Sequence, residues 1–147
     1  MITFRKSILF LLLFMLAFSS TLFSDSPQAQ ATVSQEKTIV YYFHGNMRCR
    51  TCNKIEKYTK EAINAGFAKE LSESLLEIRI VNTDKSENEH FIKDFKLTNR
   101  SVVLVQNRGE KLERWKNLDR IWLLVRKKEA FQSYINEETR AFMAVEK

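Results

Sequence analysis

The chain runs TIVYYFHGNMRCRTC from Thr38 to Cys52, so that an apolar stretch leads directly to a pair of cysteines. Residues 38–44 are β-branched or aromatic almost throughout, which favours a central strand buried on both faces. Gly45 ends this stretch, and from about Arg50 the spacing of the apolar residues becomes helical. The cysteines are therefore expected where a buried strand is followed by the start of a helix.

Cys49 and Cys52 are the only cysteines of the chain. A disulfide between them would close a very short loop and constrain the unfolded chain little, so a redox pair explains this spacing better than a structural staple. At a helix N-terminus, unpaired backbone N–H groups and the positive end of the helix dipole favour a thiolate. We therefore predict Cys49 as the nucleophile, Cys52 as the resolving thiol, and Arg48 and Arg50 as residues that tune the thiolate.

The chain after the cysteines alternates between helical and strand patterns. One apolar stripe predicts a helix from about Arg50 to Gly66. The stripe consists of Cys52, Ile55, Thr59, Ala62 and Ile63. Further elements are expected as a helical turn or two over 67–74, a strand over 76–82, and a helix opened by a capping box at 86–89.

A hairpin and a long last helix are predicted for the C-terminal part. Residues 101–106 have the pattern of a buried strand, and a turn pairs them with residues 111–116. Asn117 or Asp119 can cap the last helix, in which we expect Trp122 to be a core residue.

The composition is that of one ordinary globular domain. The chain has 147 residues, of which 44% are hydrophobic and 29% charged, with three glycines and one proline. These values exclude a disordered or collagen-like chain. The net charge of +6 comes from basic residues mixed with acidic ones in helical stretches. Since no nucleic-acid-binding motif accompanies that charge, we expect no nucleic acid partner.

Residues 1–31 have the pattern of an export segment. Arg5 and Lys6 precede an apolar run, and small residues at 29 and 31 allow cleavage after Ala31. The alternative is an uncleaved membrane anchor through residues 8–23, slightly shorter than the ~20 residues of a spanning helix. We therefore predict a signal peptide or N-terminal anchor over 1–31, a single domain over 32–147, and an extracytoplasmic location, either periplasmic or secreted.

The predicted order of elements, with a Cys-x-x-Cys where the first strand meets the first helix, resembles the thioredoxin fold. Residues 95–110 are similar to the family's stretch from its middle helix through its third strand to an Asn-Gly turn. Residues 41–62 are more narrowly similar to small exported thioredoxin-like proteins labelled as nitrophenyl-compound nitroreductase subunits. The resemblance implies an α/β thioredoxin-like fold with a central mixed sheet of about four strands, flanking helices and a long C-terminal helix.

Two positions depart from the pattern that the resemblance implies. Ser101 stands where the family has a cis-proline opposite the cysteines, so the Arg100–Ser101 bond is expected to be trans. Phe43 stands where the family has a buried acid beneath the second cysteine. His44 is the candidate auxiliary proton donor, although strand alternation points it away from the face of Phe43. These departures favour a dedicated partner over general peptide exchange.

Three functions are compatible with these residues. The first is thiol–disulfide exchange with a protein partner, which needs no metal or organic cofactor. The second is soft-metal carriage, because Met47, Cys49 and Cys52 have the Met-x-Cys-x-x-Cys spacing of Cu(I) carriers and His44 could add a ligand. The third is a redox-inert interaction protein on the same fold.

Overall fold

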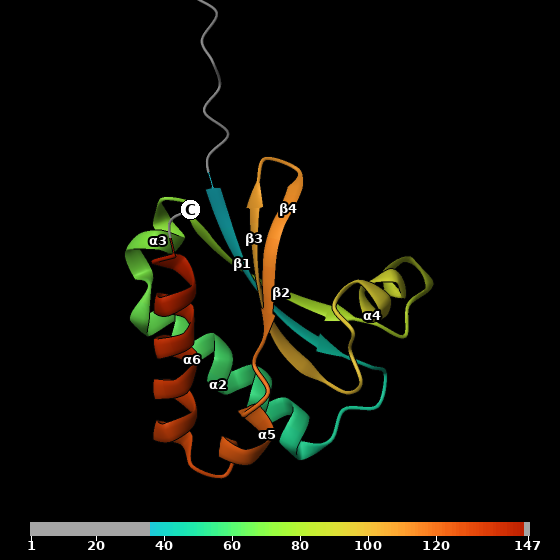
Figure 1. Ribbon diagram of the computed structural model, residues 1–147. Coiled ribbons are helices and arrows are strands. Elements are labelled where there is room, and N and C mark those ends of the chain that lie inside the picture. Colours follow the sequence, from blue (N-terminus) through green and yellow to red (C-terminus); the bar gives the residue numbers. More distant parts are fainter. Residues whose placement is uncertain (1–35, 146–147) are drawn as a thin grey trace, which may run out of the picture. The chain divides into compact units, whose positions relative to one another are not determined.

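The structure is a computed structural model that describes residues 36–145 (Figure 1). The predicted export segment and anchor, residues 1–31, lie outside the described residues. Within the described part, no helix is long and apolar enough to cross a membrane.

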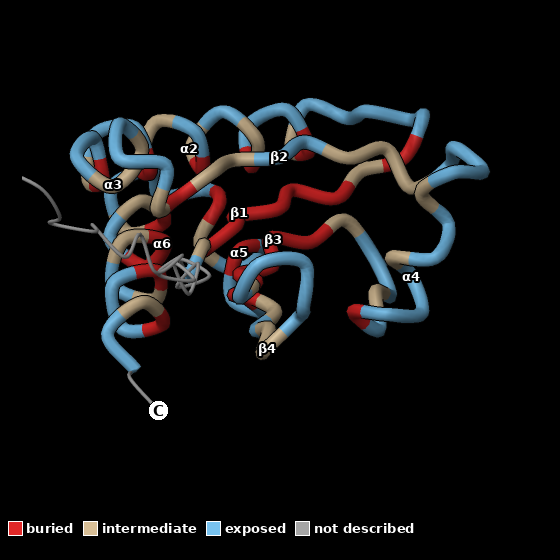
Figure 2. The backbone as a smooth tube through the Cα atoms, turned by 90° about the horizontal axis from the view of Figure 1, so that it is seen from above, coloured by how far each residue is buried: buried red, intermediate tan, exposed pale blue. Residues whose placement is uncertain are grey.

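A mixed four-stranded sheet forms the centre of the domain, in the order β2-β1-β3-β4. β1 (Glu36–His44) pairs in parallel with β2 (Leu76–Asn82) and antiparallel with β3 (Ser101–Arg108). β3 pairs antiparallel with β4 (Lys111–Asn117). The two central strands, β1 and β3, are buried along most of their length, as Figure 2 shows. Their β-branched and aromatic residues are suited to this environment because neither face meets water.

Helices cover both faces of the sheet (Figure 1). The long helices are α2 (Arg50–Gly66) and α6 (Lys128–Met143), which pack side by side. The short ones are α3 (Ala68–Ser72), η2 (Ser86–Asn88), α4 (His90–Asp94) and α5 (Ile121–Leu124). The residues of α2 that are buried are the five predicted for its stripe, Cys52, Ile55, Thr59, Ala62 and Ile63.

The alternation along β1 divides the core into two parts. Val40 and Tyr42 pack with α2, α5 and α6 in the larger cluster. Ile39, Tyr41 and Phe43 point to the other face, where aromatic residues of α4 and its flanks cover them. The odd and even residues of one strand thus contact different helices.

The long last helix was predicted as one piece and is two. α5 is a single turn that inserts Ile121 and Val125 into the core, and α6 begins only at Lys128. Lys127 has extended backbone angles between them, with φ −121° and ψ 93°. The extended backbone of Lys127 therefore separates the turn that buries Ile121 from the helix that buries Phe131 and Ile135.

The capping box predicted at residues 86–89 is absent. Ser86 begins the 3₁₀ turn η2, whose N-cap is Lys85, and no side-chain hydrogen bond caps it. α4 starts at His90 and has only five residues. A short turn that places Phe91 and Phe95 over the sheet replaces the longer helix that the pattern predicted.

Candidate functional site

Cys49 is the N-cap residue of α2. Its backbone is extended, with φ −78° and ψ 167°, and its carbonyl accepts the first helical hydrogen bond, from the N–H of Asn53 at 3.1 Å. Its sulfur accepts a hydrogen bond from the backbone N–H of Cys52 at 3.2 Å. The side chain therefore takes the place that a serine or aspartate usually occupies at a helix start, where a negative charge is favoured.

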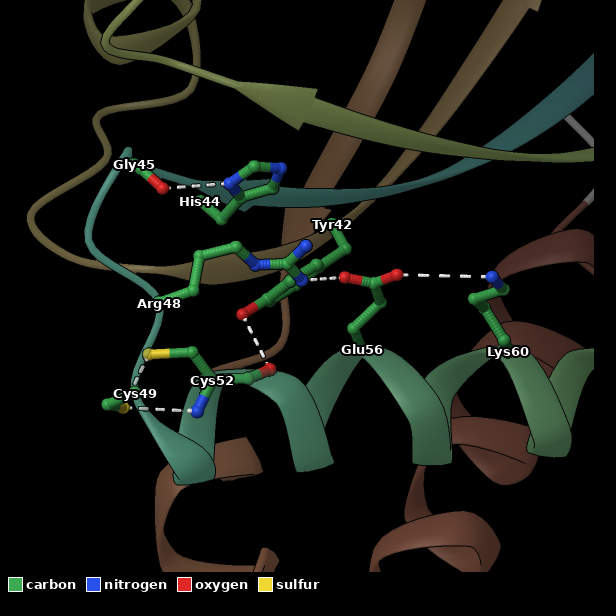
Figure 3. Close-up of polar contacts among 8 residues, drawn as sticks. All are labelled: Tyr42, His44, Gly45, Arg48, Cys49, Cys52, Glu56 and Lys60. Carbon is green, nitrogen blue, oxygen red and sulfur yellow. Dashed lines mark hydrogen bonds and ion pairs between the residues drawn. The ribbon is translucent and has the colours of Figure 1, made fainter.

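The two sulfurs face each other at 2.6 Å, and both cysteines are free thiols (Figure 3). Cys49 is exposed, whereas the side chain of Cys52 is 3% exposed. The pKa of Cys49 is held below its ordinary value, most strongly by the hydrogen bond from the Cys52 thiol and next by that from the backbone N–H of Cys52. The pKa of Cys52 is raised, most strongly by burial and next by its hydrogen bond to Cys49. The pair is thus an accessible sulfur that ionises readily and a buried one that keeps its proton.

The two flanking arginines differ in their surroundings. Arg48 turns along α2 and forms an ion pair with Glu56, which also lies 3.9 Å from the amine of Lys60 (Figure 3). Arg50 is the first residue of α2 and is exposed. Hydrogen bonds from Cys52, first from its thiol and then from its backbone N–H, are the largest causes that lower the pKa of Cys49, and the tuning role of Arg48 and Arg50 stays a prediction.

Tyr42 lies beneath the second cysteine, a contact that the sequence analysis missed. Its hydroxyl donates to the backbone carbonyl of Cys52 at 2.9 Å, and burial raises its pKa to about 12. Phe43, the residue aligned with the family's buried acid, instead faces the opposite side of the sheet, where its ring stacks on Tyr41 at 5.1 Å. The sequence could have indicated this contact, because strand alternation puts Tyr42 and Phe43 on opposite faces of the sheet and Cys52 belongs to the buried stripe of α2.

His44 stands on the same face as Tyr42 but apart from the sulfurs. Its ring lies 6.0 Å from that of Tyr42, and its Nδ1 is 2.9 Å from the carbonyl of Gly45 (Figure 3). It lines a neighbouring hollow together with Gly45 and Thr83. The structure therefore does not bring the candidate auxiliary residue to the thiols.

Ser101 is buried at the start of β3, where it pairs with Phe43. Its hydroxyl donates to the carbonyl of Asn99 at 3.0 Å and not to a thiol. The bond that precedes it is trans, since no peptide bond among residues 36–145 is cis. The loop before β3 thus approaches the cysteines without the bend that a cis-proline would impose.

A groove of about 440 Å³ opens beside the two cysteines. We call it the cysteine groove; it is lined by Asn46, Met47, Arg48, Cys49, Cys52, Arg100 and Trp122. Arg100 and Trp122 come from parts of the chain far from the cysteines in sequence, and no motif pointed to them.

Trp122 is not the core residue that was predicted. Its side chain is 37% exposed, and its indole N–H donates to the carbonyl of Arg100 at 2.9 Å. The short turn α5 explains the difference, because Ile121 and Val125 take the buried positions and leave Trp122 at the rim.

No family model matches the chain, and no curated protein matches it either. Among solved structures, one is described only as a malarial protein; it is 14% identical, with 63% of this chain and 96% of that chain covered and a TM-score of 0.36. A thioredoxin from Thermus thermophilus is 13% identical, with 70% of this chain and 74% of that chain covered and a TM-score of 0.39. The strand order β2-β1-β3-β4 and the cysteines at the start of α2 agree with the thioredoxin-like architecture expected from the sequence.

The described residues contain no group of three or more His, Cys, Asp or Glu side chains that could hold a metal ion. Met47, Cys49 and Cys52, the residues of the soft-metal alternative, line one groove, with the two sulfurs 2.6 Å apart.

Removing the thiol of Cys52 is expected to raise the pKa of Cys49. The variant Cys52→Ala loses the S–H donor, the largest cause of the lowered pKa, while the backbone N–H of residue 52 stays. Only the thiolate reacts, so the alkylation rate of Cys49 rises with pH, and the midpoint of that rise reports the pKa of Cys49. In Cys52→Ala this midpoint is expected to be higher than in a variant that keeps a hydrogen-bond donor on the side chain of residue 52. The variant Cys52→Ser keeps a hydroxyl donor and is the matched control, with a lower midpoint than Cys52→Ala. Identical midpoints in the two variants would show that the backbone alone sets the acidity.

Proposed function

We propose that the protein is an exported thiol–disulfide oxidoreductase in which Cys49 is the nucleophile and Cys52 the resolving thiol. The observation that carries this proposal is the exposed sulfur of Cys49 at the N-cap of α2, hydrogen-bonded by both the thiol and the N–H of Cys52. The thioredoxin-like fold is compatible with a redox role. Export is supported by the pattern of residues 1–31.

The exchange proceeds in two displacements. In the reducing direction, the thiolate of Cys49 attacks one sulfur of a partner disulfide, a mixed disulfide forms, and the other partner sulfur leaves as a thiolate. The thiol of Cys52 then loses its proton to water and displaces the partner from Cys49. Two electrons pass to the partner, whose two thiolates take protons from water, and Cys49 and Cys52 end as a disulfide. The oxidising direction reverses the same steps.

We further propose that this couple is more oxidising than a housekeeping thioredoxin. A hydrogen-bonded thiolate at a helix start stabilises the reduced form, and a stabilised reduced form makes a stronger oxidant. The reduction potential, measured by equilibration with glutathione, is expected above the ~−270 mV of thioredoxin. A potential at or below that value would contradict this part of the proposal.

Catalysed reduction of a protein disulfide by dithiothreitol tests the exchange function. The wild-type domain is expected to accelerate the reaction, and Cys49→Ser is expected to reduce it to the rate without protein, because no other exposed thiol exists in the chain. Arg126→Gln, a change at an exposed residue outside the cysteine groove, is the control and should keep the wild-type rate.

A Cu(I) titration of the same domain, run beside the exchange assay, tests the other two functions. Tight Cu(I) retention without exchange would favour metal carriage through Met47, Cys49 and Cys52. An absence of both would favour a redox-inert interaction protein. The narrower likeness to nitrophenyl-compound nitroreductase subunits adds no nitroaromatic substrate to the proposal, because no residue of the cysteine groove argues for one.

A further inference from the structure

We propose that the cysteine groove selects disulfide substrates with a carboxylate beside the reacting sulfur, and that Arg100 binds this carboxylate. This substrate class deepens the exchange function proposed above and depends on it. Arg100 lines the same groove as both cysteines.

Two contacts hold Arg100 in place beside the sulfurs. Its Nη2 donates to the carbonyl of Met47 at 3.2 Å, which ties it to the loop that precedes Cys49. Its own carbonyl accepts the indole N–H of Trp122 at 2.9 Å, and the same N–H lies 3.2 Å from the side-chain oxygen of Asn99. The first contact thus holds the guanidinium, and the second fixes the backbone of Arg100.

The charge of Arg100 lacks a counter-ion within the described residues. No acidic side chain lines the cysteine groove, and none of the ion pairs among residues 36–145 includes Arg100. Its Nε is buried and has no hydrogen-bond partner there. A buried donor without a partner costs free energy.

Arg48, the other cation of the groove, differs because it is already paired with Glu56. A carboxylate that enters the groove therefore meets the guanidinium of Arg48, which Glu56 already neutralises, and that of Arg100, which forms no ion pair with the described residues. An anion bound to Arg100 would lie in the same groove as both reacting cysteines.

The rim of the groove supplies apolar contacts beside this charge. Met47 is 80% exposed and Trp122 37% exposed, and both line the groove. Exposed side chains of this size and softness are suited to packing against the substrate's own side chains. The substrate that fits best carries its negative charge on the side of Arg100 and apolar groups toward Met47 and Trp122.

Three peptide disulfides test the proposal. Each peptide has one cysteine, joined to the same neutral coloured thiol and flanked by two glutamates, two glutamines or two lysines. The reduced protein releases the coloured thiol when Cys49 attacks, and each rate is divided by the rate of the same peptide with dithiothreitol. We expect the glutamate peptide to react about fivefold to tenfold faster than the isosteric glutamine peptide, and the lysine peptide to react slowest.

Variants of Arg100 separate binding of the carboxylate from reactivity of the sulfur. Arg100→Gln is expected to reduce the glutamate-to-glutamine ratio to below about twofold, while Arg100→Lys keeps part of it. Arg126→Gln makes the same change in net charge outside the groove and should leave the ratio unchanged. The ratio should also shrink as the salt concentration rises toward about 1 M.

The outcomes distinguish the two proposals. Equal rates for all three peptides with the wild-type protein would overturn the carboxylate preference and leave the exchange function standing. The same result follows if Arg100→Gln and Arg126→Gln lower the ratio alike, because the preference would then come from net charge. Failure of every peptide to react would overturn the exchange function, and the substrate class with it.

Discussion

Cys52→Ser is expected to convert the protein into a trap that stays covalently bound to its substrate. Cys49 keeps its exposed place at the N-cap of α2 and attacks a disulfide as before. The second displacement fails because a serine hydroxyl cannot resolve the mixed disulfide. Mass spectrometry of the intact protein should show close to one adduct per chain, which persists after free substrate is removed and disappears with dithiothreitol.

Cys49→Ser is the control for the trap. The remaining sulfur, that of Cys52, is 3% exposed, and burial raises its pKa. An ordinary cysteine is only about 3% thiolate at pH 7, and a raised pKa lowers that fraction further. We expect at least about tenfold slower adduct formation than in Cys52→Ser. Equal adduct formation in the two variants would reverse the assignment of nucleophile and resolving thiol.

The elements near the cysteines could be predicted because local patterns determine them. The stripe of α2 has the helical period, and the run before Gly45 is β-branched and aromatic almost throughout, which favours a buried strand. The N-cap position of Cys49 follows from where one pattern ends and the next begins. The mixed sheet of about four strands, which the resemblance implied, is confirmed.

The rest of the site could not be predicted because tertiary packing brings it together. Arg100 and Trp122 reach the cysteine groove through the loop before β3 and the turn α5. Trp122 was assigned to the core on its size alone, yet its neighbours Ile121 and Val125 occupy the buried positions. Which residues of a continuous apolar run are buried depends on the axis of the helix, and the run itself contains no information on that axis.

Phe131→Ala is expected to cost about 3–5 kcal/mol of unfolding free energy. Phe131 is fully buried in α6, and the ring of Tyr58 from α2 meets it edge to face at 5.9 Å. Its removal leaves a cavity between the two long helices that the surrounding core can fill only in part. Urea unfolding of the reduced protein, with the slope unchanged and the midpoint lowered, measures the loss.

Leu123→Ala is the matched control, because Leu123 is 77% exposed and its truncation should change the unfolding free energy by no more than about 0.5 kcal/mol. The same variants test whether packing of the core affects the reactivity of Cys49. Phe131 lies outside the cysteine groove, so Cys49 in the folded fraction of Phe131→Ala should be alkylated with the wild-type pH midpoint. A shifted midpoint would show that packing of α6 against α2 helps to set the acidity of Cys49. A stability loss equal to that of Leu123→Ala would contradict the place of Phe131 at the centre of the larger core.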